Sequence, residues 1–236
     1  MNCIVLDQGN TSTKWGAFVD GGLLNTGRIS DQNLSDQLLE LKEKYNFPFL
    51  YSSVRSEKEQ VDFLTRFEFC YAIPNRHFPS YNYTSGVAGK DRLANVAGAS
   101  LLFKGEDSLV IDFGTCITYS VARQNELISG AISLGAQSRL RGMHEFTGKL
   151  PLLNFSETDQ AFQNSTEGAM LSSVNFGILS ELKGYIEQAL QESPNINLVF
   201  TGSDAQHFAK QLNYRIFVEL NLTLIGLYAI TCANES

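Results

Sequence analysis

The sequence predicts an α/β protein built from two similar halves, and three observations support this prediction. A short apolar strand followed by Asp-x-Gly and a second β-prone run occurs twice, about half a chain apart. Segments with helical spacing of apolar residues alternate with these strands, which favours mixed sheets flanked by helices. Because 43% of its 236 residues are hydrophobic, the chain can bury a sizeable core.

The strands are predicted first by the two repeated segments. In the first, an apolar run at Cys3–Leu6 leads into Asp-Gln-Gly-Asn-Thr-Ser-Thr-Lys at 7–14 and then into Trp15–Val19. In the second, Leu109–Ile111 leads into Asp-Phe-Gly-Thr-Cys-Ile-Thr at 112–118, and the second run continues to Ala122. Each segment predicts a β-hairpin with a glycine-containing turn. Further strands are predicted at 49–54, 130–135 and 197–200.

Helices are predicted between these strands. Apolar side chains recur at helical spacing over 34–45, 93–101 and 170–189, and the last of these helices is expected to open at Thr166. A helix-like stretch leads to Leu212, and a final apolar helix is predicted over Phe217–Thr231. The polar segment 104–108 is the expected boundary, which gives an N-terminal half at 1–106 and a C-terminal half at 107–236.

Composition and charge exclude several classes of protein. The formal net charge of −7 argues against a nucleic-acid partner, which would require a basic surface. The three His form no zinc-binding pair, and the four Cys lie far apart, which is typical of reduced thiols in a reducing compartment. We find neither a signal peptide nor an apolar stretch of about 18 residues, so we expect a cytoplasmic protein without a membrane partner.

The two Asp-x-Gly turns are candidate phosphate sites. A glycine after a strand allows close approach of a ligand, and successive backbone N–H groups with Thr and Asn side chains can form an anion cradle. Lys14 would add a positive charge, and an Asp at a strand end could hold Mg²⁺ together with phosphate oxygens. One such turn is usually a plain hairpin, whereas two Thr-rich copies favour phosphate binding. Neither is a P-loop or a dinucleotide-binding fingerprint.

The segment Gly89-Lys90-Asp91-Arg92 is a candidate catalytic motif at a helix start. Asp91 could accept a hydroxyl proton during phosphoryl transfer, and Arg92 could pair with a substrate carboxylate. The alternative is structural, because an Asp at a helix N-terminus commonly caps the helix. The Thr201-Gly202-Ser203 turn could pass near an adenine or ribose, or could simply join a strand to a helix.

Taken in order, the motifs resemble those of the type III pantothenate kinases, which belong to the acetate/sugar kinase–Hsp70–actin superfamily. Besides the two Asp-x-Gly segments, the matching motifs are Gly89-x-Asp91-Arg92, Gly130-Ala131-Ile132-x-x-Gly135, Leu150-Pro151, Thr166-x-x-Ala169-Met170 and Thr201-Gly202. The resemblance implies two ribonuclease H-like (actin-like ATPase) halves with a cleft between them. It also implies ATP-dependent phosphorylation of pantothenate to 4'-phosphopantothenate, the first step of coenzyme A biosynthesis.

The resemblance also implies roles for individual residues. The ATP-binding residues would be Asp7, Gln8, Gly9, Asn10, Thr11, Ser12, Thr13, Lys14 and Thr115. Asp91 would be the catalytic proton acceptor. Pantothenate would be bound by Tyr83, Gly89, Lys90, Asp91, Arg92 and Thr166, the last across the interface of a homodimer. Mg²⁺ would accompany ATP, and Asp112 would bind a monovalent cation, K⁺ or NH₄⁺.

Four features depart from the family pattern. Ser120 stands where the second phosphate motif usually ends in Asp, Leu134 replaces a Pro, and Ser203 replaces a Gly. The stretch before Gly89 is one residue short, so Tyr81 is the alternative to Tyr83. Two other functions stay open: a non-catalytic nucleotide-binding regulatory protein of the same fold, and a nucleotide or polyphosphate hydrolase. Pantothenate-dependent formation of ADP would distinguish the kinase from both.

Overall fold

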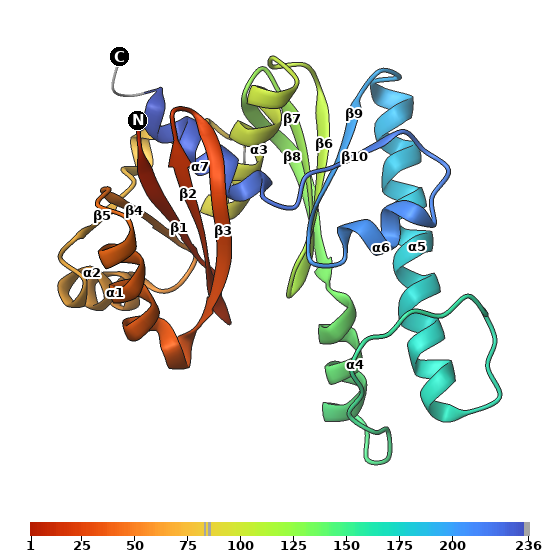
Figure 1. The fold of residues 1–236 in the computed structure, drawn as a ribbon. Helices are drawn as coiled ribbons and strands as arrows, with labels where there is room; N and C mark the ends of the chain where they lie inside the picture. Colours follow the sequence, from red (N-terminus) through yellow and green to blue (C-terminus); the bar gives the residue numbers. More distant parts are fainter. Residues whose placement is uncertain (83, 85, 234–236) are drawn as a thin grey trace. The chain divides into compact units, whose positions relative to one another are not determined.

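The structure, a computed structural model, describes residues 1–82, 84 and 86–233 and divides them into two compact units (Figure 1). Unit 1 comprises Met1–Gly105, Asn125–Leu127 and Asn221–Ser236, and unit 2 comprises Glu106–Gln124 and Ile128–Leu220. Each unit holds one five-stranded mixed sheet with helices against it. The predicted α/β class with two similar halves is therefore confirmed.

Unit 1 is built on a sheet with the strand order β3-β2-β1-β4-β5. Its strands are β1 (Cys3–Gln8), β2 (Ser12–Val19), β3 (Gly22–Ser30), β4 (Phe49–Ser53) and β5 (Cys70–Ala72). Strands β1, β2 and β3 form an antiparallel meander, whereas β4 and β5 run parallel to β1. The helical segments are η1 (Asp31–Asn33), α1 (Leu34–Lys44), α2 (Glu57–Arg66), η2 (Asn75–His77), α3 (Lys90–Leu102) and α7 (Leu222–Cys232).

Side-chain alternation along β1 gives unit 1 two cores, one on each face of its sheet. Ile4 and Leu6 pack with the buried residues of α1 and α2, such as Leu38 and Phe63. Cys3 and Val5 point to the opposite face and pack with the buried residues of α3 and α7. The first phosphate motif therefore follows a strand that is fixed from both sides.

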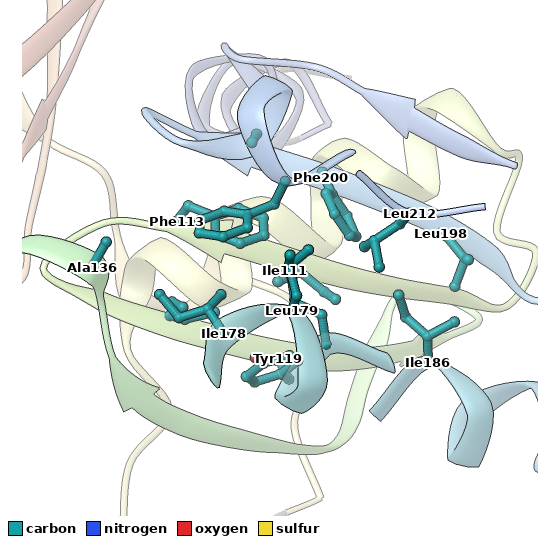
Figure 2. Close-up of a cluster of buried hydrophobic side chains, with 14 of the residues drawn as sticks. Ile111, Phe113, Tyr119, Ala136, Ile178, Leu179, Ile186, Leu198, Phe200 and Leu212 are labelled. Carbon is teal, nitrogen blue, oxygen red and sulfur yellow. The ribbon is translucent and has the colours of Figure 1, made fainter. Parts of the chain in front are cut away.

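Unit 2 repeats this topology with the order β10-β9-β6-β7-β8. Its strands are β6 (Ser108–Phe113), β7 (Cys116–Arg123), β8 (Glu126–Leu134), β9 (Asn197–Gly202) and β10 (Ile216–Val218). Its helices are α4 (Ala136–Glu145), α5 (Thr166–Glu192) and α6 (Ala205–Lys210). Figure 2 shows its core, in which Ile111 and Phe113 of β6 and Phe200 of β9 lie with Ile178 and Leu179 of α5.

The C-terminal part differs from the prediction. The expected helix over Phe217–Thr231 is wrong at its start, because Ile216–Val218 pairs in parallel with Leu198–Phe200 and forms β10. The helix α7 begins at Leu222 and belongs to unit 1, because its residues Leu224 and Leu227 complete the core against β1. The last segment of the half predicted at 107–236, from Asn221 onward, therefore belongs to unit 1. The first boundary between the units lies between Gly105 and Glu106. Within the described residues, every helix is too short or too polar to span a bilayer.

Candidate functional site

The first Asp-x-Gly segment forms the tight connection between β1 and β2. Asp7 lies opposite Lys14 and Gln8 lies opposite Thr13, while the N–H of Gly9 donates to the carbonyl oxygen of Ser12 at 3.0 Å. Asn10 and Thr11 are exposed at the tip. The hairpin predicted from the sequence is confirmed, and Asn10 and Thr11 at its tip face solvent.

The residues of this hairpin divide between the two faces of the sheet. Directly opposed residues of an antiparallel pair share a face, so Asp7 and Lys14 lie together on the face covered by α3 and α7. Gln8 and Thr13 lie on the other face and are buried. The Oε1 atom of Gln8 accepts hydrogen bonds from the Tyr51 hydroxyl at 2.5 Å and the Ser53 hydroxyl at 3.1 Å. Its side chain therefore stabilises the strand end, while Asp7 and Lys14 flank the side where α3 lies.

The predicted catalytic motif lies in the first turn of α3. Gly89 is the N-cap residue, and the N–H of Leu93 donates to its carbonyl oxygen at 3.1 Å. Oδ1 of Asp91 accepts from the main-chain N–H of Arg92 at 2.8 Å, and a Cβ on Gly89 would lie 2.5 Å from the same oxygen. A side chain at position 89 would therefore displace the Asp91 carboxylate from its present position. Burial lowers the pKa of Lys90.

Helix α3 is fixed by a close crossing with α7. A Cβ on Gly226 would lie 1.8 Å from the carbonyl oxygen of Ala94, and a Cβ on Gly98 would lie 2.7 Å from that of Leu222. The hydroxyl of Thr223 donates to Oδ1 of the buried Asn95 at 2.8 Å. The two backbones can approach this closely only because both helices carry glycine at the contact.

The second Asp-x-Gly segment, in unit 2, connects β6 to β7. Asp112 lies opposite Thr118 in the antiparallel pair and beside Thr201 of the parallel strand β9. Gly202 has a φ of +93°, and a Cβ there would lie 2.7 Å from Oδ1 of Asp112 and 2.3 Å from the Phe113 carbonyl oxygen. The structure therefore brings the predicted adenosine-side turn directly against the second phosphate motif.

A third turn meets the same motif. The N–H of Gly135, at the start of α4, donates to the Thr115 carbonyl oxygen at 2.9 Å, and Ser138 donates to the same oxygen at 2.7 Å. A Cβ on Gly135 would lie 2.1 Å from the carbonyl oxygen of Gly114. The glycines of three separate sequence motifs thus meet around residues 112–115 in unit 2.

The remaining predicted residues are distributed as follows. Thr166 is the exposed first residue of α5, whose N-cap Ser165 accepts from the N–H of Gly168 at 3.1 Å. Tyr81 is 37% exposed and pairs in a bridge with Leu127. Tyr83 lies outside the described residues. All four cysteines are free, as predicted. Among the residues that the structure describes, no cluster of three or more His, Cys, Asp or Glu could hold a metal ion alone.

A polar network behind the second motif was not predicted from the sequence. Glu181 of α5 accepts from the Tyr119 hydroxyl at 2.7 Å and from the Ser133 hydroxyl at 2.5 Å, and it pairs with Arg139 of α4 at 2.5 Å. Burial acts to raise the pKa of the Glu181 carboxyl, but these hydrogen bonds outweigh burial and lower it. The carboxylate therefore ties β7, β8 and α4 to α5.

We expect Glu181→Gln to lower the free energy of unfolding at pH 7 by about 1–3 kcal/mol. The three donors that now bond to a charged carboxylate would face a neutral amide that accepts through one oxygen only. A carboxyl whose folded-state pKa is depressed stabilises the fold above its unfolded pKa, here 4.5, and loses that contribution as pH falls through the folded pKa. In urea unfolding, the difference in the free energy of unfolding between Glu181→Gln and the parent protein should therefore be smaller at pH 4 than at pH 7. The exposed Glu187→Gln on the same helix is the control, and an equal loss in both variants would contradict the assignment.

Comparison with known proteins decides the family. The model of the family described as type III pantothenate kinase matches residues 3–188. The chain belongs to the type III pantothenate kinase family. Two relatives with this name match along nearly their whole length. The protein of Flavobacterium psychrophilum is 33% identical and covers 95% of this chain and 96% of its own, and that of Cytophaga hutchinsonii is 34% identical and covers 96% and 97%.

Membership of the type III pantothenate kinase family makes this chain a phosphotransferase, and solved structures agree on its fold. A structure from Campylobacter jejuni described as a Baf family transcriptional activator has a TM-score of 0.68 at 20% identity and covers 98% of both chains. MreB5 of Spiroplasma citri bound to ADP has a TM-score of 0.53 at 11% identity and covers 99% of this chain and 98% of its own. At these identities the likeness shows the actin-like ATPase fold alone.

Proposed function

We propose that this chain transfers the γ-phosphoryl group of ATP to the hydroxyl of pantothenate, with Asp91 as proton acceptor, giving ADP and 4'-phosphopantothenate. The observation that carries the proposal is that Asp91 opens α3, the helix that packs on the same sheet face as Asp7 and Lys14. Family membership supplies the two substrates. In-line phosphoryl transfer requires positioning and charge stabilisation, and this set of residues offers both.

Each residue then has a distinct task. The Asp91 carboxylate accepts the hydroxyl proton as the oxygen attacks phosphorus, and the Arg92 guanidinium pairs with the carboxylate of pantothenate. Asn10 and Thr11 offer main-chain N–H groups, and Lys14 offers a positive charge, to the phosphates of ATP, while Gly9 lets the phosphates approach the turn closely. Gly89, Lys90 and Tyr81 or Tyr83 are the remaining proposed pantothenate contacts. On the second motif, Thr115 is the proposed nucleotide contact.

The donor set fits Mg²⁺ bound chiefly by nucleotide. Mg²⁺ in kinases takes one or two carboxylates together with phosphate oxygens, so the single carboxylate of Asp7 at the end of β1 suffices. When bound, the ion neutralises charge on the phosphates. We therefore expect Mg²⁺ to bind together with ATP.

We also propose Asp112 as the ligand of a monovalent cation. Oδ1 of Asp112 would lie 2.7 Å from a Cβ on Gly202, so glycine at this position keeps carbon away from the carboxylate. The proposed cation, K⁺ or NH₄⁺, would be held by this carboxylate. The neighbouring strand carries the buried Ser120 where the family pattern has Asp, so the cation would depend on fewer charges here.

A homodimer is the proposed assembly, with Thr166 contacting the pantothenate bound to the partner. Three large apolar side chains of unit 2 support it, because Phe146, Leu152 and Phe162 are 89%, 61% and 93% exposed. Phe162 lies four residues before Thr166. Light scattering should give twice the chain mass of 26.1 kDa, and a monomer at micromolar concentration would contradict the proposal.

The proposed location of the protein is the cytoplasm. Its four free cysteines favour this reducing compartment, and cell fractionation would test the location.

One coupled assay tests the proposed reaction. Purified protein with ATP and Mg²⁺ is expected to form ADP only when pantothenate is present, and K⁺ or NH₄⁺ is expected to raise the rate above that in Na⁺. Formation of ADP without an acceptor would indicate a hydrolase. Nucleotide binding without turnover would favour the regulatory protein, and a rate indifferent to the monovalent cation would remove the role proposed for Asp112.

A further inference from the structure

The turn of the first phosphate motif is held from outside by an arginine that no motif includes. Nε of Arg55 donates to the carbonyl oxygen of Gly9 at 2.9 Å. Its Nη2 donates to both carboxylate oxygens of Asp31, at 2.7 and 2.8 Å. The Arg55 side chain is only 15% exposed, whereas that of Asp31 is 45% exposed, so the guanidinium is partly buried and its partner faces solvent.

The segment that carries Arg55 is itself bonded to the end of β1. The N–H of Val54 donates to the Gln8 carbonyl oxygen at 3.2 Å, and the Ser53 hydroxyl donates to Oε1 of Gln8 at 3.1 Å. That hydroxyl oxygen also accepts from the N–H of Arg55 at 3.1 Å. On the other side, Gln60 of α2 donates to the Arg55 carbonyl oxygen at 2.7 Å. The guanidinium therefore projects from a well-fixed backbone.

Holding the Gly9 carbonyl has a direct consequence for the next residue. The C=O of Gly9 and the N–H of Asn10 belong to one planar trans peptide, in which the two groups point in opposite directions. Fixing the carbonyl oxygen on Arg55 therefore directs the Asn10 N–H away from Arg55. Glycine at position 9 has few steric limits on its backbone, so this peptide could otherwise rotate at little cost.

We propose that Arg55, oriented by Asp31, is a positioning residue that fixes the Gly9–Asn10 peptide so that its N–H is directed at the phosphates of ATP. This inference rests on the proposed function, which places those phosphates at the turn. Arg55 acts through the turn, and its own charge is already paired with Asp31. A lysine would not replace it, because one ammonium group lacks the planar fork that spans Gly9 and Asp31.

The test compares Arg55→Ala, Arg55→Lys and the double variant Asp31→Asn/Arg55→Ala with the parent protein. We expect Arg55→Ala to raise KM for ATP about tenfold and to weaken binding of the non-hydrolysable analogue AMP-PNP with Mg²⁺ by a similar factor. KM for pantothenate should change less than about twofold. Arg55→Lys should recover only part of the loss. The double variant Asp31→Asn/Arg55→Ala should be no worse than Arg55→Ala, because both substitutions remove one interaction.

Arg66→Ala is the matched control, since Arg66 of α2 hydrogen-bonds to Ser35 and packs on Phe67 in the same unit. An equal rise in KM for ATP in Arg66→Ala would reduce the effect to general destabilisation and overturn the proposal. An unchanged KM in a folded Arg55→Ala protein would also overturn it. If the parent lacks pantothenate-dependent turnover, the proposed function fails, but AMP-PNP calorimetry on parent and Arg55→Ala still decides the positioning role. Absence of AMP-PNP binding by the parent would overturn both.

Discussion

Replacing Asp91 by Asn is expected to lower kcat for pantothenate phosphorylation about a thousandfold while AMP-PNP binding stays close to that of the parent protein. An amide cannot accept the hydroxyl proton. It can still accept the hydrogen bond from the Arg92 N–H through its oxygen, so α3 should begin as it does now. The measurement is a steady-state coupled assay, with calorimetry for the nucleotide.

Asp36→Asn provides the control for this substitution. Asp36 is also an acidic residue in the first turn of a helix of unit 1, and it is exposed on α1. Its variant should keep the parent kcat, because it removes the same favourable interaction with a helix N-terminus without touching the proposed site. Near-normal turnover by Asp91→Asn would remove Asp91 from the mechanism, and loss of AMP-PNP binding would instead assign it to the nucleotide.

Replacing Gly226 by Ala is expected to lower the free energy of unfolding by about 3 kcal/mol, with loss of turnover in the fraction that folds. The added methyl group would lie 1.8 Å from the Ala94 carbonyl oxygen, which belongs to helix backbone and cannot move alone. Helices α3 and α7 would have to separate. Since α3 carries Asp91 in its first turn, the substitution would displace the proposed base as well.

Guanidinium unfolding measures this effect, with Gly184→Ala as the control. Gly184 lies exposed inside α5, where a Cβ would meet no atom within 4 Å. Alanine has the better helix propensity, so Gly184→Ala should stabilise the protein by roughly 0.8 kcal/mol. The two substitutions should therefore change the free energy of unfolding in opposite directions. The helix crossing at Gly226 explains this difference, because both glycines lie inside helices. A Gly226→Ala protein as stable as the parent would show that α3 and α7 can separate without cost.

Patterns local in the sequence predicted much of the fold. The two repeated Asp-x-Gly segments and the helical spacing of apolar residues correctly predicted both hairpins and the helices α1, α3 and α5. The prediction missed α2, because Phe63 is its only buried residue and its apolar face is short. A capping box from Ser56 to Glu59 was the available signal. The strand β10 was taken for helix because its pairing with β9 is a tertiary contact that periodicity cannot show.

The sequence predicted the separate turns of the candidate site, but it did not predict how their side chains are arranged in space. Spacing identified Asp7, Asp91 and Asp112, but only strand register shows that Asp7 and Lys14 share a face while Gln8 and Thr13 are buried on the other. The contact between Arg55 and Asp31 joins residues 24 positions apart and follows no motif. Side chains that orient a main-chain turn can be recognised only once the fold has brought them to it.

The return of the last helix to the first unit has a consequence for biosynthesis. Ribosomes release the chain from its N-terminus, so the sheet of β1 to β5 emerges long before α7. Until then, one face of that sheet lacks the part of its cover that α7 supplies. That part includes Tyr228, whose ring stacks on Phe18 with the ring centroids 4.2 Å apart and whose hydroxyl donates to the Met1 carbonyl oxygen at 3.2 Å. Strand β1 and helix α7 thus share one core. A nascent chain arrested before residue 222 would therefore hold every proposed catalytic residue without the packing that keeps α3 in place.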